Sequence, residues 1–202
     1  MQLFSYLVLG DSYTIGEAVF LQKSFPYQAV QLLRNSGVNI AAPEIIAKTG
    51  WTSGELIAAI DQQKFLARYD FVSLLIGVNN QYRGLPIEVY KTELEQLIVK
   101  SILFAGGKPE HVAILSIPDY SFTPFAQSLN KNKIAKEIDE YNNLNKELAF
   151  RYKLHYIDNT KGSREDRNTP GFIAPDGLHP SEQEYSHWAK KLSDIVLKSL
   201  HL

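Results

Sequence analysis

Ser12 lies just after an apolar segment, from which Gly10 and Asp11 separate it, in the stretch LVLGDSYT of residues 7–14. A serine beside a glycine is ordinary turn chemistry. A serine hydroxyl is also the nucleophile of many acyl-transfer enzymes. At neutral pH it then needs an adjacent base and a group that holds the base in its useful tautomer. Whether Ser12 has chemistry to perform therefore depends on what the rest of the chain can bring to it.

His179 and Asp176 could supply the base and the group that orients it. They lie in APDGLHPSE, residues 174–182, just before a segment of helical period. At this spacing one short turn lets the carboxylate reach one ring nitrogen while the other nitrogen faces Ser12. An Asp-x-x-His pair in front of a helix is also common in helix capping, so the pair gains meaning only together with other residues.

The oxyanion that develops in acyl transfer needs preorganised hydrogen-bond donors. The candidates are the backbone N–H groups of Ser12 and Gly50 and the side-chain amide of Asn79. Gly50 lies in KTGWTSGEL, residues 48–56, and Asn79 lies in IGVNN, residues 76–80. Each is also a common turn residue, because glycine permits unusual backbone angles and asparagine bonds its own loop.

Alternating apolar and helical segments must position these residues. Short, nearly continuous apolar runs predict buried parallel strands at residues 4–9, 45–47, 71–76, 112–117 and 154–157. Helical periods follow at residues 25–35, 53–67, 86–105, 133–152 and 181–200, and the last opens with SEQE, the form of a capping box. Strands that alternate with helices predict an α/β fold, a three-layer α/β/α sandwich around a five-stranded parallel sheet.

The polar candidates all come after predicted strands. Ser12, Gly50 and Asn79 follow the first three strands, while Asp176 and His179 come after the fifth strand and a long irregular segment, residues 159–175. In open α/β sheets, ligands bind outside the carboxyl ends of the strands. We therefore expect these five residues to meet at one edge of the sheet.

Composition limits the class of protein. A chain of 202 residues, 45% of them hydrophobic, is of a size to form a single domain over residues 1–202. A net charge of −1 argues against nucleic acid as a partner, and the lack of cysteine excludes disulfides and thiolate chemistry.

The pattern of apolar residues also predicts the cellular location and the oligomeric state. No run approaches the roughly 18 apolar residues of a membrane span, so no integral membrane association is expected. The start, MQLFSYLVLG, has neither the basic region nor the cleavage site of a signal peptide, which predicts a cytoplasmic protein. The absence of an obvious exposed apolar stripe favours a monomer.

The four stretches around Ser12, Gly50, Asn79 and the Asp176–His179 pair together resemble the four sequence blocks of the SGNH hydrolase superfamily, also called GDSL-type esterases and lipases. LGDSYT is similar to the first block, with its nucleophile at Ser12, and DGLHPS to the last, with Asp176 and His179. KTGWTSGEL and IGVNN are similar to the blocks that place oxyanion donors at Gly50 and Asn79. The resemblance implies a flavodoxin-like sheet and ester hydrolysis by a Ser-His-Asp triad without metal or cofactor.

The third block departs from the family pattern. Many members carry Gly-x-Asn-Asp there, whereas this chain has Asn80 after Asn79. The oxyanion donor is kept, but the hydrogen bonding around it must differ, because an amide both donates and accepts.

The substrate is expected to be a small-molecule ester with a short acyl group, such as an O-acetyl ester, because residues 119–133 show no hydrophobic lid helix. A lysophospholipase or thioesterase of the same superfamily is the alternative within the class. A different class is a non-catalytic flavodoxin-like small-molecule-binding module, in which Ser12, Thr14 and Gly16 cradle a phosphate. A metal site is not favoured, because no other histidine is expected beside His179.

Residues in the loops at this edge are candidates for substrate binding. The set comprises Tyr13, Trp51, Asn80, Tyr82 and Arg83, with Tyr120, Phe122 and Phe172 as further aromatic side chains near the edge. Aromatic rings can stack on sugars or line an acyl pocket, although single loop aromatics often only pack.

Overall fold

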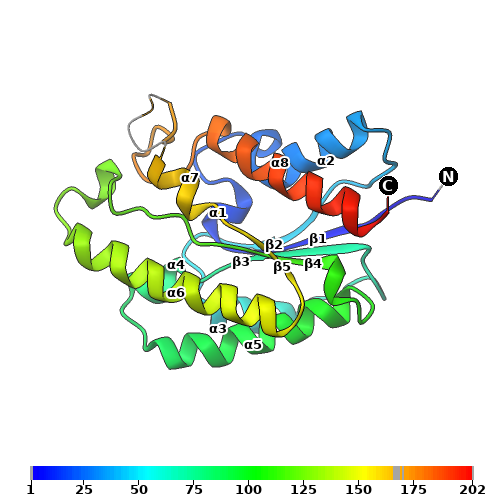
Figure 1. Ribbon diagram of the computed structural model, residues 1–202, viewed down its shortest axis with the longest axis horizontal. Helices are drawn as coiled ribbons and strands as arrows, with labels where there is room; N and C mark the ends of the chain where they lie inside the picture. Colours follow the sequence, from blue (N-terminus) through cyan, green and yellow to red (C-terminus); the bar gives the residue numbers. More distant parts are fainter. Residues whose placement is uncertain (1, 166–168, 170, 202) are drawn as a thin grey trace.

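A computed structural model of the chain shows a parallel sheet between two layers of helices (Figure 1). The structure describes residues 2–165, 169 and 171–201. The strands are β1 (Tyr6–Gly10), β2 (Glu44–Ala47), β3 (Phe71–Leu75), β4 (Val112–Leu115) and β5 (His155–Ile157). They pair in parallel in the order β2-β1-β3-β4-β5, which confirms the predicted α/β fold and its flavodoxin-like sheet.

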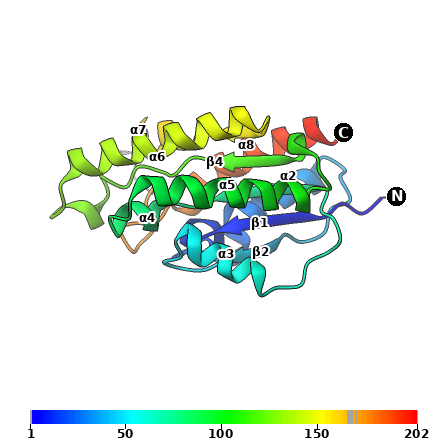
Figure 2. The ribbon, with the colours of Figure 1, turned by 90° about the horizontal axis from the view of Figure 1, so that it is seen from below.

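Helices cover both faces of the sheet (Figures 1 and 2). One face carries α1 (Ser12–Ile15), α2 (Phe25–Asn35), α7 (Thr160–Glu165) and α8 (Glu182–Ser199). The other carries α3 (Ser53–Asp61), α4 (Val78–Tyr82), α5 (Ile87–Phe104) and α6 (Lys131–Arg151). Because helices lie on both sides, every residue of β1, β3 and β4 is buried, which explains why these strands appear in the sequence as nearly continuous apolar runs.

The order of the strands fixes where a ligand can bind. The chain leaves β1 to form β2 on one side and then returns to form β3 on the other side. The connections therefore diverge at the carboxyl ends of β1 and β3 and leave a crevice between them. Ser12 follows β1 and Asn79 follows β3, so two of the predicted site residues stand beside this crevice.

Four of the five predicted helices are confirmed to within two residues at each end. The exception is α3, which ends at Asp61, well before the predicted residue 67. Phe65 lies beyond the end of the helix and packs on Phe104, with ring centroids 4.5 Å apart. The segment 159–175 is not wholly irregular, because α7 lies within it, where Asp158 accepts a hydrogen bond from the Lys161 backbone at 2.9 Å. Residues 166–168 and 170 of that segment lie outside the described residues.

The predicted capping box at the start of α8 is only half formed. Ser181 Oγ accepts from the Glu184 backbone at 3.4 Å, as expected. The Glu184 carboxylate, however, accepts from the indole N–H of Trp188 at 2.7 Å, and the Ser181 backbone N–H donates to Phe172. A buried tryptophan N–H needs a partner, and this need redirects the glutamate. A complete capping box forms instead at α3, between Thr52 and Glu55.

None of the described helices combines the length and apolar character needed to cross a bilayer.

Candidate active site

The Gly-Asp-Ser block folds as a strand, a turn and a helix. Gly10 ends β1 where a side chain would collide with the Thr14 hydroxyl and the Leu75 carbonyl, so only glycine fits. Asp11 caps α1, because its Oδ1 accepts from the Tyr13 backbone at 3.0 Å. Ser12 is thereby held in the first turn of the helix, where a backbone N–H has no partner within the helix.

Asp11 is a structural cap and not an exposed base. Its side chain is buried, and among the described residues its second carboxylate oxygen, Oδ2, has no hydrogen-bond partner. Burial raises the pKa of Asp11 to about 7, although the hydrogen bond from Tyr13 opposes the shift. Near neutral pH the carboxyl group is therefore partly protonated, which limits the charge buried beside Ser12.

Asp176 and His179 form a closed turn. Asp176 Oδ2 lies 2.5 Å from Nδ1 of His179, and its Oδ1 accepts from the backbones of Leu178 and His179, both at 3.0 Å. Partial burial would raise the pKa of Asp176, but the hydrogen bonds from His179 and Leu178 outweigh it and hold the pKa below its usual value. The ionised carboxylate thus keeps the proton on Nδ1 of His179, which leaves Nε2 as the basic nitrogen.

A small antiparallel contact holds this turn in place. Ile173 pairs with Pro180, the Ala174 backbone donates to the His179 carbonyl at 2.8 Å, and the Phe125 backbone donates to the Gly177 carbonyl at 3.0 Å. The Tyr13 ring stands edge-on to the His179 ring, with centroids 5.4 Å apart. The position of the imidazole is therefore fixed from both sides.

Ser12, Asn79 and His179 line one pocket of about 100 Å³. Most of its remaining wall is aromatic or aliphatic and consists of Tyr13, Val78, Tyr82, Tyr120, Phe125 and Leu178. The structure thus brings three of the predicted site residues together. Asp176 reaches this pocket only through His179, and Gly50 is not among its lining residues.

Asn79 is positioned by the turn that precedes it. Gly77 begins α4 with a φ of 123°, and a Cβ there would lie 2.7 Å from the ring of Tyr90. The Asn79 side-chain amide donates to the Trp51 carbonyl at 3.0 Å, which ties it to the loop that carries Gly50. An amide nitrogen has two donors, so a second N–H remains for the pocket.

Asn80 bonds within the protein. It is fully buried; its Oδ1 accepts from the Ser53 backbone at 2.9 Å, and its Nδ2 donates to Ser53 Oγ at 2.7 Å. Ser53 Oγ then donates to the carboxylate of Glu93 at 2.5 Å. A hydroxyl has one proton to give, so a carboxylate on α5 requires a donor at position 80. The Asn80 amide thus supplies the hydrogen-bond donor that the Ser53 hydroxyl needs once it donates to Glu93, and it holds the start of α3 in place.

We expect Asn80→Asp to lower the free energy of unfolding by about 1–3 kcal/mol, because the Ser53 hydroxyl would then face two carboxylates with one proton. Urea denaturation measures this effect. In the double variant Asn80→Asp with Glu93→Gln, the glutamine amide again gives the Ser53 hydroxyl a hydrogen-bond donor, which should restore most of the stability. If Asn80→Asp is as stable as the unmodified protein, or if the double variant is no better than the single one, the pairing of Asn80 with Glu93 is wrong.

The candidate substrate contacts divide into two groups. Tyr13 and Tyr82 line the pocket, and Tyr82 is 55% exposed. Asn80, as described above, bonds within the protein. Arg83 lies 3.3 Å from Glu55 and also donates to the Gly50 carbonyl, so its charge is already paired. Trp51 is half-buried and lies outside the lining of this pocket.

Three wall residues were not among the candidates: Val78, Phe125 and Leu178. Val78 and Leu178 are each adjacent to a predicted site residue, Asn79 and His179, so their place in the blocks was a usable signal. The sequence gives no such signal for Phe125, which enters through the tertiary fold.

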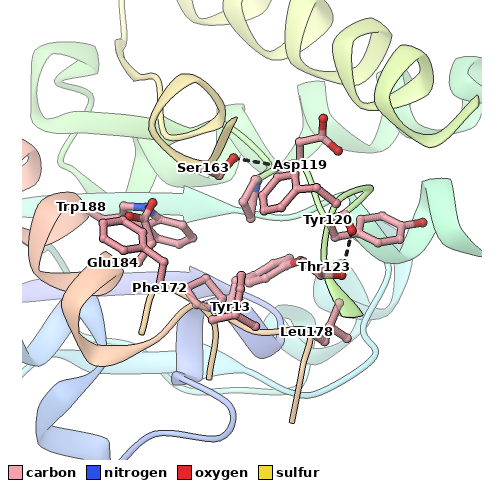
Figure 3. A pocket seen from close by; sticks show the side chains of 13 residues that line it. Tyr13, Asp119, Tyr120, Thr123, Ser163, Phe172, Leu178, Glu184 and Trp188 are labelled. Atoms are coloured by element: carbon pink, nitrogen blue, oxygen red, sulfur yellow. Dashed lines mark hydrogen bonds between the residues drawn. The ribbon is translucent and has the colours of Figure 1, made fainter. Parts of the chain in front are cut away.

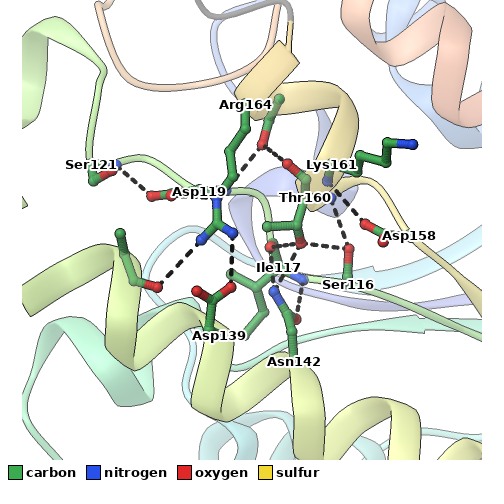
Figure 4. A network of polar contacts seen from close by, with 12 residues as sticks. Ser116, Ile117, Asp119, Ser121, Asp139, Asn142, Asp158, Thr160, Lys161 and Arg164 are labelled. Atoms are coloured by element: carbon green, nitrogen blue, oxygen red, sulfur yellow. Dashed lines mark hydrogen bonds and ion pairs between the residues drawn. The ribbon is translucent and has the colours of Figure 1, made fainter. Parts of the chain in front are cut away.

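The segment that carries Tyr120 and Phe125 is anchored by Arg164 (Figure 4). Arg164 points from α7 between two carboxylates, 2.8 Å from Asp119 and 2.8 Å from Asp139 of α6. Asp119 also accepts from the Ser121 backbone at 2.9 Å. The aromatic wall of the pocket is therefore fixed to α6 and α7.

The phosphate cradle of Ser12, Thr14 and Gly16 is not supported. Thr14 is completely buried with its hydroxyl against Gly10, and Gly16 is buried against Ser24, where a Cβ would lie 2.5 Å from the Ser24 side chain. Neither lines the pocket that Ser12 lines. Within the described part of the chain, no three His, Asp or Glu side chains are grouped as a metal site requires.

The flavodoxin-like sheet is a fold of ester-hydrolysing serine hydrolases, and the family comparison places this chain in that class. Residues 8–186 match the model of the GDSL-like lipase/acylhydrolase family, and the chain belongs to this family. A search of curated proteins gave no match.

Solved structures share this fold. Axe2, an acetylxylan esterase from Geobacillus stearothermophilus, superposes with a TM-score of 0.71 at 20% identity, covering 100% of this chain and 97% of Axe2. TesA superposes with a TM-score of 0.68 at 19% identity and covers 98% of both chains. The esterase EstA from Pseudoalteromonas sp. gives 0.64 at 18% identity, covering 98% of this chain and 99% of EstA. At these identities the likeness concerns the fold.

Proposed function

We propose that the protein hydrolyses short-acyl carboxylic esters, such as O-acetyl esters, with Ser12 as nucleophile, His179 as base and Asp176 as the orienting acid. One observation carries the proposal. A histidine whose Nδ1 is engaged by a carboxylate at 2.5 Å shares an apolar pocket with a serine at a helix start. A serine hydroxyl needs these two partners to attack an ester.

In the acylation step, Ser12 Oγ forms a bond to the ester carbonyl carbon while His179 Nε2 takes the hydroxyl proton. The imidazolium is stabilised by Asp176 and then gives this proton to the leaving alcohol as the ester C–O bond breaks. In the second step, His179 takes a proton from water, whose oxygen forms a bond to the acyl carbonyl carbon, and the bond from that carbon to Ser12 Oγ then breaks. The acid is released and the proton returns to Ser12.

Donors for the oxyanion come from two helices and a loop. The Ser12 backbone N–H lies in the first turn of α1, and the second N–H of the Asn79 amide is not used by Trp51. Gly50 supplies a third donor in this proposal, from the loop to which Asn79 is bonded. Donors fixed before reaction stabilise the charge without reorganisation, which accounts for their large effect on rate.

The size of the pocket supports a short acyl group. About 100 Å³ between fixed aromatic walls holds a few water-sized groups. A long acyl chain, as a lysophospholipase requires, exceeds this space. Axe2, an acetylxylan esterase, shows that this fold occurs in an enzyme named for acetyl esters.

Hydrolysis of p-nitrophenyl acetate, butyrate and octanoate by the purified full chain tests the proposal. We expect turnover of all soluble short esters, with kcat/KM highest for acetate or butyrate. Highest activity on octanoate would refute the short-acyl assignment while keeping the esterase. No turnover of any ester by the folded protein would refute the esterase itself.

A further inference from the structure

We infer that Leu178 sets the acyl length of the catalytic pocket, because it closes off a second apolar space that continues the acyl subsite. The inference rests on the proposed esterase function. It concerns a specificity-determining side chain that lies between Asp176 and His179 in the sequence.

The second space, drawn in Figure 3, adjoins the catalytic pocket, because the two share lining residues. Its volume is about 20 Å³, enough for a single water-sized group. In Figure 3, Leu178 and Tyr120 stand on one side of it and Trp188 and Phe172 on the other. Most of the lining is apolar or aromatic, including Phe122. An acyl chain that entered it would meet a hydrophobic surface.

Tyr13, Tyr120 and Leu178 line both spaces and therefore form the wall between them. The Tyr13 ring contacts a residue of each space. Its centroid lies 5.4 Å from that of His179, which lines the catalytic pocket, and 6.4 Å from that of Trp188, which lines the second space. These distances indicate that the two spaces are separated by about the thickness of one side chain.

The three wall residues are held differently. Tyr13 is buried against His179 and belongs to the first turn of α1, so its loss would disturb the catalytic side chains. The Tyr120 hydroxyl donates to Gln81 at 2.8 Å, which fixes that ring. The Leu178 side chain is half-buried and held by packing, while its backbone N–H carries the bond to Asp176. Leu178 is thus the part of the wall that can be shortened while the catalytic turn is kept.

Three of the polar side chains around the second space are bonded within the protein. Asp119 is paired with Arg164 at 2.8 Å, and Ser163 Oγ donates to the Thr160 carbonyl at 2.8 Å. Glu184 accepts from Trp188 at 2.7 Å. These three polar groups therefore ask for no partner from a ligand, and the rest of the lining is mostly apolar or aromatic, which suits an aliphatic acyl tail and not a charged one.

The experiment compares kcat/KM for p-nitrophenyl octanoate with that for the acetate. In Leu178→Ala the octanoate-to-acetate ratio should rise about tenfold over the unmodified chain, the gain expected when about two more methylene groups leave water. Leu178→Val, which removes less packing, should move the ratio in the same direction by a smaller factor. It remains informative if the alanine variant folds poorly.

Leu154→Ala is the matched control. Leu154 is half-buried against the core, as Leu178 is, but it lines neither space, so its truncation should change the ratio less than threefold. If both Leu178 variants leave the ratio unchanged, or if Leu154→Ala raises it equally, the inference is wrong while the esterase function stands. If the unmodified chain hydrolyses no ester, the proposed function fails and this inference fails with it.

Discussion

In the Ser12→Ala variant, kcat for p-nitrophenyl acetate should fall at least about 10⁴-fold. The alanine leaves His179 with no hydroxyl to deprotonate, so no acyl-enzyme can form. Initial rates with purified protein, free of contaminating host esterase, measure the loss. The residual rate reports what the oxyanion donors and the pocket do without a nucleophile.

The fold should survive this change. Asp11 caps α1 through the Tyr13 backbone, and the Ser12 hydroxyl takes no part in that bond. The midpoint of thermal unfolding of Ser12→Ala should therefore stay close to that of the unmodified chain. Ser36→Ala is the matched control, because Ser36 is exposed at the end of α2 and should keep full activity. A Ser12→Ala variant that retains a tenth or more of the activity would exclude Ser12 as nucleophile.

Asp176→Asn should lower kcat by about 10³- to 10⁴-fold, although the shape of the turn is kept. An asparagine oxygen can still accept from the backbones of Leu178 and His179, as Oδ1 does now. Its amide donates to Nδ1 of His179, so the ring proton moves to Nε2. The nitrogen that must take the serine proton is then already protonated. Steady-state kinetics of the purified variant measure the loss.

Two comparisons separate this tautomer effect from a general loss of charge. Asp194→Asn removes the same charge from an exposed position on α8 and should leave kcat unchanged. Combining Asp176→Asn with Ser12→Ala should lower the rate no further than Ser12→Ala alone, because the residues act as one unit. Losses that multiply in the double variant would mean that Asp176 acts independently of Ser12.

Much of the fold follows from local sequence. The strand positions, the bounds of α2 and the order of strands and helices depend on apolar periodicity and turn residues, which are properties of neighbouring residues. The same holds for the Asp176 to His179 turn, whose two partners lie three positions apart in one loop. By contrast, α7 has only one clear turn of helix and a mixed polar composition, so periodicity does not reveal it.

The sequence alone also determined which residue types could do the chemistry. Ser12, Asn79 and the Asp176 to His179 pair follow from their places after strands, because the carboxyl ends of parallel strands share one edge. What only the tertiary structure decided is what surrounds them. Asn80 is paired with Glu93 through Ser53, and Tyr13, Tyr120 and Leu178 divide two apolar spaces. Such contacts join segments that are far apart in the chain, and their partners are chosen by how helices and loops pack across the sheet, which no local pattern records.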